Sequence, residues 1–166
     1  MSINIEPLQS DHDTGSFSCG VQALEHWLRQ TAGQHARKGI SRTYVAVDPN
    51  RRETILGYYS LTVGEAHSPD LPPALARKLP KKIPIVPIGR LAVALDMQGK
   101  GLGGTLLADA LTRIVRIAGE VGIAAIVVDA KDDQSVKFYR HYGFLPFPDD
   151  PQRLLLPVST AQAAIR

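Results

Sequence analysis

The sequence predicts an α/β fold in a single domain, with a mixed central β-sheet flanked by helices. Segments with apolar residues at helical spacing alternate along the chain with short segments rich in β-branched and aromatic residues. In particular, a strand over residues 86–95, an amphipathic helix over 105–118 and an apolar strand over 123–129 are typical of a parallel crossover unit. A length of 166 residues suits one core. We therefore expect a single domain over residues 1–166.

A helix is predicted near the N-terminus, because apolar residues recur there at helical spacing. Ser18 suits the N-cap position of this helix. We expect the helix to run to about Gln34, with Gly39 beyond its end. The apolar residues that set the spacing are Val21, Leu24, Trp27 and Leu28.

Two strands are predicted next, over residues 43–47 and 55–63. The residues between them, Asp48-Pro49-Asn50, have the composition of a turn, so an antiparallel hairpin is expected. The segment 67–84 holds five of the twelve prolines, and only a short helix over 73–79 is expected in it.

The C-terminal part supplies the remaining predicted elements. The strand over 123–129 is apolar without alternation, as expected when both faces of a sheet are covered. A helix is predicted over 135–142, and Gly143 is placed to end it in the left-handed conformation. The last predicted strand covers residues 153–158.

The net charge of +3 is distributed unevenly along the chain. Residues 1–28 carry four acidic and no basic side chains, whereas residues 29–100 carry twelve Lys or Arg and five acidic residues. Residues 101–166 are neutral overall, with seven of each sign. A basic middle third suits a polyanionic partner, although a solvated basic face is the alternative.

Several classes of protein are excluded or disfavoured by composition. The single cysteine, Cys19, excludes an intramolecular disulfide and a four-cysteine zinc site, and it is expected to be a small residue at a helix start rather than a nucleophile. The five histidines show no metal-ligand spacing, so no metal is expected. No apolar run approaches the roughly 20 residues of a membrane helix, and no secretory signal is evident. We therefore expect a cytoplasmic protein.

A glycine-rich loop lies between a predicted strand and a predicted helix, with the sequence Gln98-Gly99-Lys100-Gly101-Leu102-Gly103-Gly104. Glycines allow the backbone to approach a ligand closely, and the following helix N-terminus favours a phosphate or pyrophosphate. Lys100 adds a positive charge. The spacing matches neither the P-loop nor the Rossmann pattern.

A second motif, Phe138-Tyr139-Arg140-His141-Tyr142-Gly143-Phe144, follows about 40 residues later. Together the two motifs resemble those of the GNAT superfamily of N-acetyltransferases. The resemblance implies that residues Gln98 to Gly104 hold the pyrophosphate of acetyl-coenzyme A. It also implies that Leu91, Ala92 and Val93 anchor the pantetheine arm and the carbonyl oxygen through backbone N–H groups. Ser135, which stands where relatives often carry alanine, is included among the expected cofactor-binding residues.

Other motifs resemble a narrower group, the acetyltransferase toxins of type II toxin–antitoxin modules. These enzymes acetylate the α-amino group of aminoacyl-tRNA, inhibit translation and usually pair with a ribbon-helix-helix antitoxin. The resemblance implies the same partners here, a possible homodimer, and contact with DNA only through the antitoxin. The motifs are Phe17-x-Cys19-Gly20, Leu24-x-x-Trp27-Leu28, Ser41-Arg42-Thr43-Tyr44-Val45, Gly57-Tyr58-Tyr59-x-Leu61 and Arg90-Leu91-Ala92-Val93.

The resemblance makes Tyr139 the expected general acid, since a phenol with a reference pKa of about 10 can protonate a departing thiolate. Tyr142 is expected to pack. No general base stands out among Glu65, His67 and Asp132. An α-amino group, with a reference pKa of about 7.7–8.0, is substantially neutral without one.

Basic residues of the middle third are the expected contacts to tRNA phosphates. They are Arg37, Lys38, Arg42, Arg77, Lys78, Lys81, Lys82 and Arg90. Two alternatives remain: a GNAT enzyme acting on a small amine or a peptide N-terminus, and a GNAT-like binding module without activity. A cationic small substrate would favour an acidic cleft, which the basic segment does not supply.

Overall fold

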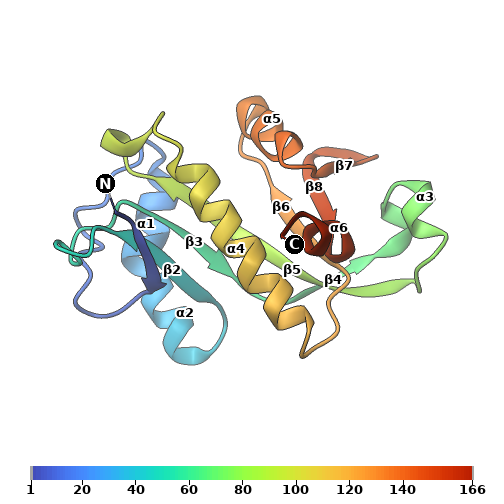
Figure 1. The fold of residues 1–166 in the computed structure, drawn as a ribbon, viewed down its shortest axis with the longest axis horizontal. Coiled ribbons are helices and arrows are strands. Elements are labelled where there is room, and N and C mark those ends of the chain that lie inside the picture. The colour runs from blue at the N-terminus through green and yellow to red at the C-terminus, as the bar shows by residue number, and fades with distance from the viewer. Residues whose placement is uncertain (1, 166) are drawn as a thin grey trace. The chain divides into compact units, whose positions relative to one another are not determined.

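The computed structural model describes residues 2–165, which form two compact units. The first unit comprises the described residues up to Thr62 together with Gly89–Ala110. The second comprises Val63–Ile88 and the described residues from Leu111 onward. Strand β5 (Lys82–Val93) and helix α4 (Leu102–Ala118) contribute residues to both units (Figure 1).

The sheet of the first unit contains β1 (Asn4–Pro7), β2 (Arg42–Val47), β3 (Gly57–Leu61) and the end of β5, in that order. Strands β2 and β3 pair antiparallel, so the expected hairpin is confirmed. Strand β1 pairs antiparallel with β2 and was not expected, because its four residues include a single strong strand former, Ile5.

Two helices replace the single helix expected near the N-terminus. Helix α1 covers Gln22–Gln30 and α2 covers Ala32–Lys38. The backbone of Thr31, with φ −118°, interrupts the helix between them, and apolar spacing does not detect such a break. The expected N-cap at Ser18 is also wrong, since the cap residue is Val21. Helix α2 runs past the expected end at Gln34 to Lys38, and Gly39 follows it, as expected, in the left-handed conformation with φ 71°, which was not predicted.

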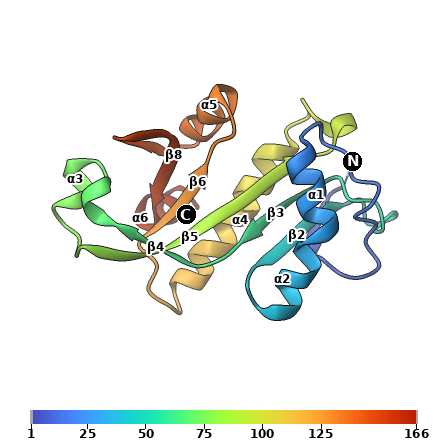
Figure 2. The ribbon, with the colours of Figure 1, turned by 180° about the vertical axis from the view of Figure 1, so that it is seen from behind.

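Adjacent tyrosines on β3 contact helices on opposite faces of the first unit's sheet. The Tyr58 hydroxyl donates to the carbonyl of Leu24 in α1 at 2.7 Å. The Tyr59 hydroxyl donates to the carboxylate of Asp109 in α4 at 2.6 Å. Figures 1 and 2 show α1 and α2 on one side of β2 and β3. Coverage of both faces explains why every residue of β3 is buried.

The second unit has a mixed sheet, as expected. The first part of β5 pairs antiparallel with β4 (Gly64–His67) and parallel with β6 (Ala125–Asp129). Strand β8 (Asp150–Pro157) runs antiparallel to β6, and β7 (Leu145–Phe147) runs antiparallel to β8. The parallel β5–β6 pair connected through α4 confirms the predicted strand–helix–strand unit.

Four further elements depart from the sequence-based expectation. The single strand expected over 55–63 ends at Leu61, and a separate edge strand, β4, begins at Gly64. The strand expected over 153–158 begins earlier, at Asp150, and helix α6 (Val158–Ile165) follows it without a break.

The remaining helices are short and lie close to their predicted positions. Helix α3 (Pro73–Ala76) occupies the start of the segment predicted as 73–79, and α5 (Asp133–His141) ends before Gly143, which has the expected positive φ of 95°. Single turns of 3-10 helix cover Ser68–Asp70 (η1) and Leu95–Met97 (η2).

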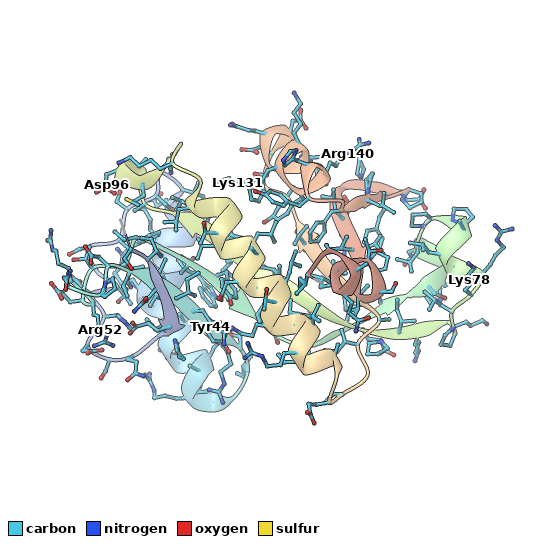
Figure 3. The ribbon with its side chains drawn as sticks, viewed as in Figure 1. Tyr44, Arg52, Lys78, Asp96, Lys131 and Arg140 are labelled. Atoms are coloured by element: carbon cyan, nitrogen blue, oxygen red, sulfur yellow. The ribbon has the colours of Figure 1, made fainter. Side chains whose placement is uncertain are left out.

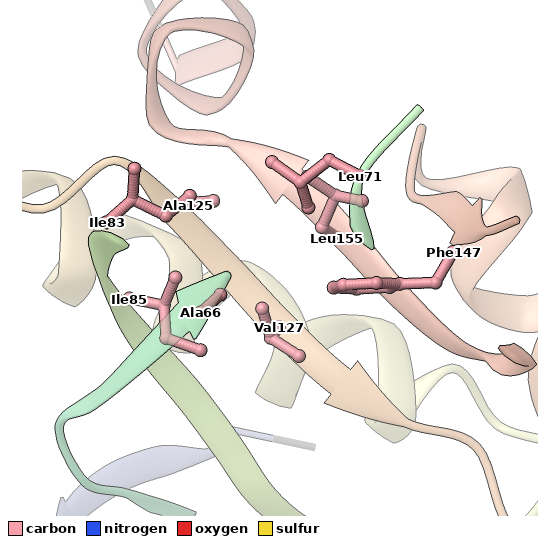
Figure 4. Close-up of a cluster of buried hydrophobic side chains, with 8 residues drawn as sticks. All are labelled: Ala66, Leu71, Ile83, Ile85, Ala125, Val127, Phe147 and Leu155. Carbon is pink, nitrogen blue, oxygen red and sulfur yellow. The ribbon is translucent and has the colours of Figure 1, made fainter. Parts of the chain in front are cut away.

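The core of the second unit joins its strands to the proline-rich segment that carries α3. Figure 4 shows this cluster, formed by Leu71 and side chains from β4, β5, β6, β7 and β8, and Leu75 and Ala76 of α3 pack against it together with Leu79. The proline-rich segment is therefore anchored by apolar contacts. The buried residues of the cluster are Ala66, Leu71, Ile83, Ile85, Ala125, Val127, Phe147 and Leu155. Among residues 2–165, no helix has the length and apolar character needed to cross a membrane.

Candidate active site

The glycine-rich loop leads from η2 into helix α4. Gly99 and Gly101 have φ values of 76° and 84°, in the left-handed region that side-chain-bearing residues rarely adopt. A Cβ atom built at either position would meet nothing within 4 Å. The loop therefore needs these glycines for its backbone path, and the space above it is open to a ligand.

The N-terminus of α4 adds hydrogen-bond donors to this loop. The N–H of Thr105 donates to the carbonyl of Gly101 at 3.2 Å, which begins the helical hydrogen-bond ladder. The N–H groups of Leu102, Gly103 and Gly104 precede this bond and have no carbonyl one turn earlier in the helix. Their partial positive charge and the exposed Lys100 suit a pyrophosphate, so the residues present fit the predicted ligand.

Gln98 holds this loop in place. Its side-chain Nε2 donates to the carbonyls of Cys19 and Val93, each at 3.0 Å. Both of its N–H donors are thus directed to protein carbonyls. The contribution of the Gln98 side chain in this structure is to fix the position of the loop rather than to present a donor to an anion.

Glu25 supports the same region and was missed by sequence reasoning. Its Oε2 accepts the N–H groups of Cys19 at 2.8 Å and Gly20 at 3.0 Å, and these hydrogen bonds lower the pKa of the Glu25 carboxyl. An acidic residue in the first turn of α1 was the available signal. Cys19 itself is 5% exposed, with its Sγ 3.6 Å from the carbonyl oxygen of Val21, as expected for a packed residue before a helix.

The predicted anchor for the pantetheine arm lies at the end of β5. The ladder that joins β5 to β6 covers Ile85 to Ile88, and Leu91, Ala92 and Val93 lie beyond the end of that ladder. Ala92 is buried, whereas its two neighbours are partly exposed. The first unit therefore contains these three residues together with the whole glycine-rich loop.

Tyr139 lies in α5, in the second unit, and its ring is 8% exposed. The ring packs edge-on against Phe138 and Phe144, with centroid distances of 5.1 and 5.5 Å. Burial raises the pKa of Tyr139 to about 12, so the phenol is protonated at neutral pH. Within residues 2–165, its hydroxyl has no hydrogen-bond partner and can donate to a ligand. Tyr142, which was expected to pack, is instead 41% exposed, although its ring lies 5.2 Å from that of Phe138.

The start of α5 engages one of the three weak candidates for a general base. Asp132 is the N-cap of this helix, and its Oδ1 accepts the N–H of Ser135 at 2.8 Å, which lowers the pKa of the carboxyl. The second candidate, His67, lies 3.8 Å from Asp70, and the third, Glu65, is exposed on β4. The α5 cap thus gives Asp132 a structural role.

The predicted tRNA-binding residues occupy both units. Arg77, Lys78, Lys81 and Lys82 are exposed on the segment around α3 in the second unit, and Figure 3 shows Lys78 extending outward from it. Arg37, Lys38 and Arg42 are exposed in the first unit, where Arg42 also donates to the carbonyl of Ala36 at 2.7 Å. Arg90 differs from these seven exposed residues, because it is half-buried and its guanidinium lies over the Trp27 ring.

Metal chemistry has no obvious ligand set in the part of the chain that the structure describes. No group of three or more His, Cys, Asp or Glu side chains among residues 2–165 is arranged to hold an ion.

Comparisons with known proteins place the chain among acetyltransferases. Residues 80–153 match the family described as "Acetyltransferase (GNAT) domain". A tRNA-acetylating toxin of Mycobacterium tuberculosis is 37% identical over 92% of this chain and 90% of its own length. A probable toxin TacT of Sinorhizobium fredii is 32% identical over 96% of this chain and 93% of its own length.

Solved structures agree with these relatives. AtaT complexed with acetyl-methionyl-tRNAfMet has a TM-score of 0.91 and 30% identity, and covers 99% of this chain and 100% of that one. AtaTR bound with AcCoA has a TM-score of 0.86 and 30% identity, with coverage of 99% and 98%. A mutant AtaT toxin bound to the C-terminus of the antitoxin AtaR has a TM-score of 0.84 and 29% identity, with coverage of 98% and 97%. This chain therefore belongs to the GNAT acetyltransferase family that includes these toxins.

Proposed function

We propose that the chain acts as a single N-acetyltransferase domain over residues 1–166 and transfers an acetyl group from acetyl-coenzyme A to the α-amino group of an aminoacyl-tRNA. Acetylation of that amine would stop the amino acid from being used in translation, as expected of a toxin. The observation that carries the proposal is the open, donor-lined glycine loop before α4, found in a chain 37% identical to a tRNA-acetylating toxin.

Of the residues assigned to the acetyl donor, all belong to the first unit except Ser135, which belongs to the second. Backbone N–H groups of the loop and the first turn of α4 would bind the pyrophosphate, with Lys100 adding a charge and Gln98 holding the loop. The end of β5 would bind the pantetheine arm and polarise the thioester carbonyl through backbone N–H groups. The residues assigned to the donor are Leu91, Ala92, Val93, Gln98, Gly99, Lys100, Gly101, Leu102, Gly103, Gly104 and Ser135.

In the transfer step, the lone pair of the neutral α-amine forms a bond to the thioester carbonyl carbon, and the carbon–sulfur bond breaks. The hydroxyl of Tyr139 gives its proton to the departing sulfur, and the phenolate regains a proton from water. Water also takes the proton that the amine loses. A dedicated base is not required, because an α-amine with a reference pKa of about 7.7–8.0 is substantially neutral at pH 7–8.

The acceptor and the antitoxin would bind through charged surfaces. The exposed basic residues around α3 and α2 would contact tRNA phosphates. A ribbon-helix-helix antitoxin would neutralise the toxin and bring it to DNA. The toxin would act in the cytoplasm, and two copies of the chain would form a homodimer. The AtaT complex with the C-terminus of AtaR supports the antitoxin as a partner.

The proposal is tested by incubating the purified chain with labelled acetyl-coenzyme A and a total charged-tRNA pool. We expect label on the α-amino group of one or a few amino acids, and none on deacylated tRNA. Peptides and polyamines are offered in parallel as competing acceptors. Label on those amines with none on charged tRNA would replace the proposal with the small-amine or peptide alternative.

A further inference from the structure

Arg90 is held in a fixed position by an aromatic stack in the first unit. Its guanidinium carbon lies 4.2 Å from the centre of the Trp27 ring. Trp27 is 8% exposed and stacks on Tyr58 with an interplanar angle of 11° and a centroid distance of 6.1 Å. His35 meets the same indole edge-on at 6.0 Å. The ring beneath the guanidinium is therefore itself immobilised.

This cation has no carboxylate partner among the residues that the structure describes. Arg52 shows the usual arrangement in the same unit, since it pairs with Glu6 and Asp11. Arg90 is half-buried and has only the ring face, and desolvation lowers its pKa, although a guanidinium stays charged at neutral pH. A partly desolvated cation without a counter-charge is costly, and a ring contact offsets this cost only in part. An anionic ligand would supply the missing partner.

The position of Arg90 restricts which anion could reach it. Arg90 directly precedes Leu91, Ala92 and Val93 on β5, and on a strand the rise from Arg90 to Ala92 is about 7 Å. Residues two apart also face the same side of a strand. A group bound by Arg90 would therefore lie close to the thioester carbonyl that these three residues are proposed to anchor.

The chemistry of the acceptor identifies the anion. In an aminoacyl-tRNA, the negative charge nearest to the α-amine is the phosphodiester of the 3′-terminal nucleotide, separated from the amine by the ester group and one ribose. A planar guanidinium matches two phosphate oxygens through parallel N–H donors, which an ammonium group does not do. The exposed cations around α3 lack such a fixed orientation.

We propose that Arg90, oriented by Trp27, binds the phosphodiester of the 3′-terminal nucleotide and makes the enzyme selective for amino acids esterified to a nucleotide. This inference rests on the proposed function. It assigns to one residue a contact that selects the acceptor's reactive end, whereas the exposed basic residues contribute affinity along the tRNA.

The test compares two small acceptors that differ by one phosphate: the 3′-aminoacyl ester of adenosine 5′-monophosphate and the same ester of adenosine. The amino acid is the one labelled in the charged-tRNA pool. We expect the wild-type enzyme to favour the phosphate-bearing ester in kcat/KM by about 10- to 100-fold, the range for a charge-assisted contact of about 1.5–3 kcal/mol. Arg90→Gln should reduce this preference to near unity, by lowering kcat/KM for the phosphate-bearing ester more than for the adenosine ester.

Controls separate recognition from folding. Arg51→Gln removes the same charge from an exposed position of the first unit and should keep the preference. If Arg90→Gln fails to fold, Arg90→Lys, which keeps the charge and loses the planar fork, should lower the preference at unchanged acetyl-coenzyme A affinity. Trp27→Phe keeps a ring and should retain most of the preference.

Three results would overturn the inference: no phosphate preference in the wild type, an unchanged preference in Arg90→Gln, or an equal loss of rate with both esters. The last would show that Arg90 only ties β5 to α1. Failure of the proposed function is distinguishable, because the wild-type enzyme would then leave charged tRNA itself unacetylated.

Discussion

The side-chain amide of Gln98 donates to the carbonyl oxygen of Cys19 across 3.0 Å, joining two residues 79 positions apart. The N–H of the same cysteine donates to Glu25 in α1 at 2.8 Å. The backbone N–H and carbonyl of Cys19 thus connect α1 to the loop that precedes α4. This connection gives Cys19 a role in supporting the proposed cofactor site through its backbone.

Replacing Gln98 with alanine should weaken acetyl-coenzyme A binding by about 5- to 150-fold, because two hydrogen bonds of about 0.5–1.5 kcal/mol each hold the loop. Gln98→Glu should have a similar effect, since a carboxylate cannot donate to the two carbonyls. Titration calorimetry measures the affinity, and Gln22→Ala, at an exposed position of α1, is the control. Wild-type affinity in a folded Gln98→Ala protein would contradict the role of this contact.

Glu25 should make the stability of the fold depend on pH. Because hydrogen bonds from Cys19 and Gly20 lower its pKa in the folded state, its contribution is present above the unfolded value near 4.5 and is lost as the pH falls through the lowered folded value. The difference in melting temperature between wild type and Glu25→Gln should therefore be larger at pH 7 than at pH 3. Thermal unfolding monitored by circular dichroism at both pH values checks this, and an equal difference would argue against the charged cap.

The charge of the ligand at the glycine loop can be tested with an isosteric pair at Gly101. Both Gly101→Asn and Gly101→Asp introduce a side chain into open space at φ 84°, a conformation that these two residues tolerate better than most. Only the aspartate adds a negative charge where the pyrophosphate is proposed to bind. We expect calorimetry to show near-complete loss of acetyl-coenzyme A binding for Asp and partial retention for Asn. Equal affinities would mean that no anion occupies this loop.

The sequence predicted the features that depend on local chemistry. The glycine loop, the helix end at Gly143, and the antiparallel hairpin of β2 and β3 all follow from residue types at fixed spacing. Tyr142, in contrast, was expected to pack and is 41% exposed, because it stands at the end of α5 rather than on the buried side of that helix.

The features that the sequence did not predict depend on contacts distant in the chain or on short edge strands. Strand β4 consists of Gly-Glu-Ala-His and is defined only by its pairing with β5. The hydrogen bonds of Gln98 and Glu25 join residues whose proximity no spacing rule indicates. The stacking of Arg90 on Trp27 similarly joins β5 to α1, so a charged residue counted only as part of a basic segment acquires a defined environment.

The basic segment around α3 should contribute salt-dependent tRNA affinity. Replacing Arg77, Lys78, Lys81 and Lys82 with alanine should reduce the slope of log K against log salt concentration by up to about 3, at about 0.7–0.9 for each lost phosphate contact. Acetyl-coenzyme A affinity should not change. Filter binding at salt concentrations between about 50 and 200 mM measures the slope, because affinity that depends on phosphate contacts changes strongly over this range.

A matched comparison uses two charges at a time. Arg77→Ala with Lys78→Ala should flatten the salt dependence, whereas Arg51→Ala with Arg116→Ala, at exposed positions elsewhere, should not. An unchanged slope in the α3 variants would make this segment a solvated face or an antitoxin contact.

Tyr139→Phe removes one hydroxyl and keeps the ring packed between Phe138 and Phe144. If that hydroxyl protonates the departing thiolate, turnover should fall by about 10²–10⁴-fold while acetyl-coenzyme A affinity stays nearly unchanged, since the proton is needed only as the thioester breaks. Because burial raises the pKa of Tyr139 to about 12, the phenol should stay protonated between pH 8 and about 10, and the wild-type rate should not fall in this range through loss of the acid.

Tyr142→Phe, at a 41% exposed position at the end of the same helix, is the control and should keep most activity. Expression of the wild-type chain alone should arrest growth, and expression of Tyr139→Phe should not. Wild-type turnover in Tyr139→Phe, or inactivity of Tyr142→Phe in its place, would show that the acid is a different residue.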